Sequence, residues 1–141
     1  MTVSVSIVVV LLLIAALVLR WVLLGNKQQP RFYDSRTCQG RNWHHAFPSS
    51  SVQDIREFLL VFVEAFAFPE KEKLKLNPED QIFQIYRAIY PSKWMPDNLE
   101  IETLARDIKA RYGISLEGVW SDDITLGELF QLTQRARAEQ A

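Results

Sequence analysis

The sequence contains few of the residues on which enzyme active sites and metal clusters depend. Its single cysteine is Cys38, and its two histidines are the adjacent His44 and His45. One cysteine cannot form an intramolecular disulfide or a cysteine-based metal cluster, which suits a reducing compartment. The sequence shows no phosphate-binding glycine loop and no nucleophile paired with a base. We therefore expect no catalytic residues, no metal and no cofactor.

Basic and acidic residues are unevenly distributed, although the net charge is only -1. Residues 1–51 carry five basic side chains against Asp34 alone, a net charge of +4. Residues 52–141 carry 11 basic and 16 acidic side chains, a net charge of -5. Phosphate binding needs a basic surface, so the acidic part argues against a nucleic-acid partner. The basic part suits anionic membrane lipid, and the acidic part suits a protein partner with a basic docking patch.

The longest apolar run is VSVSIVVVLLLIAALVLRWVLL, at residues 3–24. About 20 apolar residues cross a bilayer as a helix, so this run predicts a transmembrane helix within residues 1–25. Arg20 and Trp21, near its end, are expected at the membrane interface. Basic residues follow the run and none precedes it, which also disfavours a cleaved signal peptide. The pattern predicts a single-pass protein of the inner or cytoplasmic membrane, with the N-terminus outside and the C-terminal domain cytoplasmic.

Residues 26–51 are polar, contain prolines and lack an apolar period, so they predict a basic, aromatic linker. The aromatic residues in it are expected to lie on the membrane surface or to pack on a partner. Cys38, His44 and His45 do not have the regular spacing of a zinc site, which agrees with the expected absence of a metal.

The rest of the sequence predicts helices alone, because its apolar residues recur at helical spacing and not in alternation. Charged residues 70–77 are expected to form a loop or a short extended piece. The expected fold class is all-α, with a transmembrane helix, a small four-helix domain over residues 52–135 and a flexible tail over residues 136–141. The four expected helices cover residues 52–68, 78–90, 97–112 and 126–135, with N-terminal signals within residues 49–51 and at Asn77-Pro78, Asp97 and Thr125, and with a stop at Gly113.

Three motifs make this domain similar to an acyl carrier protein over roughly residues 50–135. They are Asp97-Asn98-Leu99-Glu100, Arg111-Tyr112-Gly113-Ile114 and Asp123-Ile124-Thr125-Leu126-Gly127-Glu128-Leu129. In that family an Asp-Ser-Leu motif opens the second main helix and an aromatic-Gly-Ile turn ends it. A segment like Thr-Val-Gly-Asp-Leu then opens the last helix. The resemblance implies a small acyl-carrier-like bundle.

Asn98 stands where that family has the serine that carries the phosphopantetheine arm. An amide side chain cannot form the phosphodiester, so the resemblance implies a carrier fold without its arm. It also implies that a protein partner docks on the third helix of the domain. The candidate partner-binding residues are Asp97, Asn98, Glu100, Glu102 and Asp107, with Trp94 and Met95 of the preceding loop as either partner contacts or caps of the core.

These observations favour a membrane-anchored, non-catalytic adaptor that docks a protein partner at the cytoplasmic membrane face. Two alternatives stay open. One is a small accessory subunit of a membrane protein complex, held mainly through its transmembrane helix. The other is a true phosphopantetheinylated carrier with an atypical attachment site.

Overall fold

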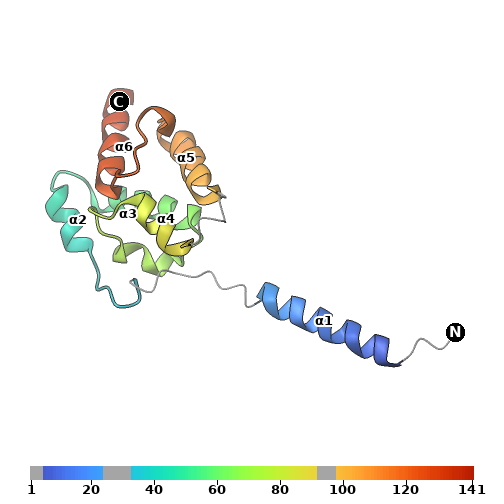
Figure 1. The fold of residues 1–141 in the computed structure, drawn as a ribbon. Coiled ribbons are helices and arrows are strands. Elements are labelled where there is room, and N and C mark those ends of the chain that lie inside the picture. The colour runs from blue at the N-terminus through green and yellow to red at the C-terminus, as the bar shows by residue number, and fades with distance from the viewer. Residues whose placement is uncertain (1–4, 24–32, 92–97) are drawn as a thin grey trace.

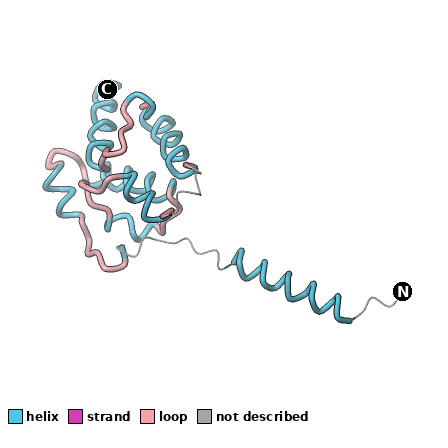
Figure 2. Tube along the Cα trace, in the orientation of Figure 1, coloured by secondary structure: helices cyan, strands magenta, loops and turns pink. Residues whose placement is uncertain are grey.

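The computed structural model describes residues 5–23, 33–91 and 98–141, and within these ranges it contains helices and loops but no strand (Figures 1 and 2). The predicted all-α class is therefore confirmed. The α-helices are α1 (Val5–Leu23), α2 (Gly40–Ala46), α3 (Val52–Ala65), α4 (Ile82–Ile89), α5 (Leu99–Tyr112) and α6 (Leu126–Gln140). Two 3-10 helices are η2 (Glu70–Lys75) and η3 (Leu116–Gly118).

Helix α1 lies apart from the other helices in Figure 1, and its large apolar side chains between Ile7 and Leu19 are 45–65% exposed. It has 19 residues, fewer than the 22-residue run on which the prediction rested, and Arg20 lies in its last turn. Along the described parts of the chain, no helix is both long enough and apolar enough to cross a membrane. This finding overturns the predicted transmembrane helix and, with it, the predicted single-pass localisation.

The segment from residue 33 to residue 51 differs from the expected linker, because it packs into the domain. Helix α2 lies within it, and Tyr33 and Trp43 are only 2% and 1% exposed. The Trp43 indole Nε1 donates a hydrogen bond to the Leu76 carbonyl oxygen at 2.7 Å. Burial also raises the pKa of Tyr33 well above its ordinary value. Tyr33 and Trp43 therefore belong to the core of the domain and are not exposed to a membrane or a partner.

A cluster of aromatic rings joins α2 to α3 and α6 at the centre of the domain. The Trp43 ring contacts the rings of Phe47, Phe58 and Phe130 at centroid distances of 5.8, 6.1 and 5.7 Å. Phe58 comes from α3 and Phe130 from α6, and both are fully buried. Aromatic pairs prefer offset-stacked or edge-to-face geometries, and the Trp43–Phe130 contact is edge-to-face with an interplanar angle of 90°. The cluster fixes the place of α2 against the longer helices.

The segment before α4 folds differently from the expectation. Residues 70–75 form the 3-10 helix η2, in which Lys73 pairs with Glu70, and Lys75 pairs with Glu72, at 2.7 Å each. Helix α4 begins at Ile82 and not at Pro78. The residues between them form a turn whose carbonyl groups accept hydrogen bonds from the first amides of α6.

Backbone hydrogen bonds join the start of α4 to the start of α6. The Leu126 and Gly127 amides donate to the carbonyl oxygens of Asp80 and Pro78 at 2.9 and 2.7 Å, and the Ile82 amide donates to Ile124 O at 3.0 Å. The first amides of a helix have no partner within it. Here the turn of residues 77–80 supplies those partners, which explains why α4 starts four residues later than predicted.

Several predicted helix ends are confirmed. The Ser51 hydroxyl accepts from the Asp54 amide and caps α3. Gly113 ends α5 with a left-handed φ of 73°, a conformation that glycine adopts without strain. Thr125 and Glu128 form the predicted capping box of α6. Helix α6 continues to Gln140, beyond its predicted end at residue 135.

A cluster of ionic contacts joins the beginning of α3 to the end of α6. The Arg137 guanidinium donates to the carboxylates of Asp54 and Glu57 and lies 5.3 Å from the centroid of the Tyr112 ring of α5. Hydrogen bonding from Ser51, and then from Arg137, lowers the pKa of Asp54. Burial raises the pKa of Tyr112. The cluster connects three helices that are distant in the sequence.

Candidate functional site

The partner-binding residues predicted from the sequence lie only partly in the described structure. Trp94, Met95 and Asp97 fall outside the described residues. Asn98 is the exposed residue that precedes α5, and its side chain forms no capping hydrogen bond. The predicted capping pair of Asp97 and Glu100 therefore lies partly outside the described residues. The Glu100 carboxylate accepts a hydrogen bond from the Tyr90 hydroxyl, just after α4.

The acidic residues of α5 do not form one continuous acidic face. Glu102 is exposed in the first turn. Asp107 lies farther along, 3.4 Å from the Arg106 guanidinium, and lines a surface groove of about 380 Å³ between α3 and α5. Lys109 and Arg111 occupy the last turn. The helix is therefore acidic at its beginning and basic at its end, a distribution that favours the helix dipole.

Leu99 adds an exposed apolar side chain to the acidic beginning of α5. Its side chain is 60% exposed, although it occupies the first helical position of the predicted docking helix. Glu102 follows three residues later, and residues at this spacing lie on the same side of a helix. The result is an apolar side chain beside an exposed carboxylate. The exposure of Leu99 is a finding of the structure.

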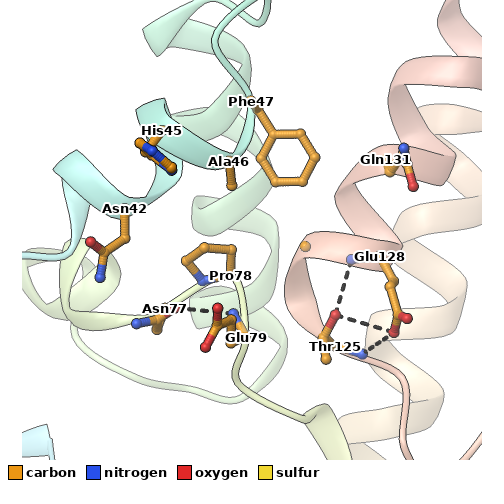
Figure 3. Close-up of a pocket in the computed structure, with 11 residues that line it drawn as sticks. Asn42, His45, Ala46, Phe47, Asn77, Pro78, Glu79, Thr125, Glu128 and Gln131 are labelled. Atoms are coloured by element: carbon orange, nitrogen blue, oxygen red, sulfur yellow. Dashed lines mark hydrogen bonds between the residues drawn. The ribbon is translucent and has the colours of Figure 1, made fainter.

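A second candidate site is a pocket of about 460 Å³ between α2 and α6 (Figure 3). One wall comes from α2, with Asn42 and His45, and the opposite wall comes from the first turns of α6. The turn of residues 77–79 lies between them. The lining residues are Asn42, His45, Ala46, Phe47, Asn77, Pro78, Glu79, Thr125, Gly127, Glu128 and Gln131.

The charged groups of this pocket are carboxylates. Glu79 follows Asn77, whose side-chain oxygen accepts from the Glu79 amide at 3.0 Å. The Glu128 carboxylate is held by the capping box, in which its Oε2 accepts from the Thr125 amide at 2.9 Å and from the Thr125 hydroxyl at 3.1 Å. Both bonds use the same oxygen, so the capping box does not occupy Oε1.

The sequence carries no local signal for this pocket. Its residues come from three separate segments, and the segment that contains His45 and Phe47 had been assigned to a linker. The local signal that was available, the capping box of Thr125 and Glu128, predicts a helix start and not a cavity. Within the described ranges, no group of three or more histidine, cysteine, aspartate or glutamate residues has a metal-binding arrangement.

Comparison of the chain with models of protein families, with curated proteins and with solved structures gives no match.

Proposed function

We propose that this chain is a non-catalytic binding module, whose helical domain docks a protein partner through the beginning of α5. The observation that carries the proposal is the 60% exposure of Leu99 next to the exposed carboxylate of Glu102. Protein interfaces commonly surround an apolar anchor with polar and charged groups. A partner with an apolar pocket and a basic rim has the complementary chemistry.

The resemblance to acyl carrier proteins supports the same surface. Helices α3, α5 and α6 follow one another in the order of that family's main helices, with the Gly113 turn and the Thr125–Glu128 capping box between them. In the resemblance, α5 is the helix on which partners dock. Asn98 precedes it in place of the serine that would carry the arm. We therefore propose a docking role without acyl transfer.

Site-specific photocrosslinking tests this proposal directly. A photoreactive phenylalanine analogue is placed at Leu99, or at Val52 as the matched control, and the full chain is irradiated in the cells that produce it. Val52 is 55% exposed and is also the first residue of its helix, α3. We expect one discrete adduct from position 99, identified by mass spectrometry, and a much weaker one from position 52.

The charge requirement is tested with Glu102→Gln, which should reduce the yield of that adduct. Equal adducts from positions 99 and 52 would contradict docking through α5. A mass increase of the chain after coexpression with a phosphopantetheinyl transferase would contradict the arm-less role and favour a true carrier.

A further inference from the structure

We propose that the pocket between α2 and α6 is a second binding site, which takes an arginine side chain from a peptide segment of a protein partner. The site is independent of the proposed docking surface on α5. In the view of Figure 1, α6 lies between α2 and α5, so the two sites are on different sides of the domain. Failure of one proposal therefore leaves the other intact.

The first argument is the sign of the charge. The described lining residues carry two carboxylates, Glu79 and Glu128, and include neither lysine nor arginine. Glu128 is held in place by its own capping box, so its carboxylate is oriented before any ligand arrives. A fixed carboxylate binds a cation without first losing the rotational freedom of its side chain. Complementary charge therefore favours a cationic ligand.

The second argument excludes an anion. Amides at the start of a helix commonly bind anionic groups, and the start of α6 lies in this pocket. Here those amides already have partners in the protein. Leu126 and Gly127 donate to the carbonyl oxygens of Asp80 and Pro78, and the Glu128 amide donates to the Thr125 hydroxyl. The amides are thus unavailable to an anion, and the two acidic residues of the lining, Glu79 and Glu128, would repel one.

The third argument concerns the shape of the cation. Phe47, Ala46 and Pro78 give the pocket an apolar part on which the methylene groups of a long basic side chain can pack. The Phe47 ring is held by the rings of Trp43 and Phe130, at centroid distances of 5.8 and 4.9 Å. The amide side chains of Asn42 and Gln131 come from opposite walls of the pocket. A guanidinium has five N–H donors in a plane, so it suits several separated acceptors better than an ammonium does.

The binding experiment uses the full chain labelled with ¹⁵N and two short alanine-glycine peptides. One peptide has a central arginine, and the other has citrulline, which has the same shape but no charge. We expect the arginine peptide to produce saturable shifts in the amide resonances of Glu79, Gly127 and Gln131. The citrulline peptide should bind about tenfold more weakly, as expected when two partly exposed charge pairs are lost.

The carboxylates are tested with the double variant Glu79→Gln/Glu128→Gln. A glutamine at position 128 can still close the capping box, so α6 should keep its first turn. The matched control is Glu117→Gln/Glu139→Gln, which removes the same charge from exposed positions away from the pocket. We expect the first variant to lose about tenfold in affinity for the arginine peptide and the control to lose almost none.

Three results would overturn the proposal. They are shifts that do not saturate or that lie outside the pocket, equal binding by the citrulline peptide, and equal affinity of the two double variants. Spermidine serves as a further probe. A fourth result would also overturn the proposal: displacement of the arginine peptide by spermidine at equal concentration would make the pocket a general site for polyamines and not a peptide site.

Discussion

The indole of Trp43 in α2 donates a hydrogen bond to the carbonyl oxygen of Leu76, 33 residues later, at 2.7 Å. The Trp43 side chain is 1% exposed, and its ring contacts Phe58 and Phe130. One residue thus connects α2 with the segment before α4 and with the buried faces of α3 and α6. The domain therefore begins no later than this segment, and a fragment that starts at α3 would lack part of its own core.

Substitution of Trp43 should destabilise the domain strongly. For Trp43→Ala we expect a loss of about 3–5 kcal/mol in the free energy of unfolding, because a large buried ring is removed. Trp43→Phe keeps a ring but leaves the Leu76 carbonyl without its donor, which costs about 1–3 kcal/mol. Urea unfolding followed by circular dichroism measures both. His44→Ala, at the exposed neighbouring position, should change the free energy by less than about 0.5 kcal/mol.

Arg36 should contribute to stability through Asp80. Its guanidinium donates to both carboxylate oxygens, at 2.6 and 2.9 Å, and Asp80 also accepts from the Asn77 amide at 2.8 Å. Arg36→Met leaves this partly buried carboxylate without its charged partner. We expect it to lower the free energy of unfolding by about 1–3 kcal/mol.

The control for Arg36 is Arg106→Met, which breaks the more exposed pair of Arg106 with Asp107. Exposed ion pairs contribute about 0–1 kcal/mol, so this variant should be close to the unmodified chain. Equal effects of the two substitutions would mean that the Arg36–Asp80 pair does not hold residues 33–39 against the 77–80 turn.

The stability of the domain should depend on the protonation of Asp54. Ser51 and Arg137 lower its pKa in the folded state below the ordinary value of 3.8. The stabilisation is therefore fully present above the unfolded pKa and is lost as the pH falls through the folded pKa. We expect Asp54→Asn to destabilise the chain at about pH 7, and the difference from the unmodified chain to shrink toward about pH 2.

Urea unfolding at a series of pH values measures this difference. Asp122→Asn removes the same charge from an exposed loop and controls for net charge. A deficit of Asp54→Asn that stayed constant down to strongly acidic pH would show that the carboxylate charge does not contribute.

Gly127 should tolerate no side chain. A Cβ at this position would lie 2.9 Å from the Pro78 carbonyl oxygen, and the Gly127 amide donates to that same oxygen at 2.7 Å. Relief of the contact would break the hydrogen bond, so we expect Gly127→Ala to cost about 1–3 kcal/mol. Gly118→Ala is the matched control, because nothing lies within 4 Å of its Cβ position. Its effect on thermal unfolding should be neutral or stabilising by about 0.5 kcal/mol.

The sequence predicts those parts of the fold whose signals are local. Gly113 ends α5, and Thr125 with Glu128 opens α6, because each signal acts within a single helical turn. Helix α2 has no such signal. Its seven residues contain only one buried side chain, Trp43, and the contacts of that side chain come from distant segments. The same reason explains why neither α2 nor the pocket beside it was foreseen.

The residues of the candidate sites also divide into those that a local pattern predicts and those that depend on contacts between distant segments. The placement of Glu102 on an exposed face of α5 follows from helical spacing alone. The outward position of Leu99 and the bond between Glu100 and Tyr90 depend on how α4 and α5 pack, which no local pattern encodes. The apolar character of residues 3–24 correctly predicted a helix, but not one that meets the requirements of a membrane span.

The three backbone bonds between the starts of α4 and α6 also set where hydrogen exchange will be slowest. The amides of Ile82, Leu126 and Gly127 each donate to a carbonyl group more than 40 residues away. Fraying of a single helix cannot expose such amides, since both segments must separate first. Their exchange with solvent deuterium therefore reports the opening of the whole domain, whereas amides near the end of α6 report local fluctuations. The exchange rates of these three amides therefore measure the free energy of global unfolding.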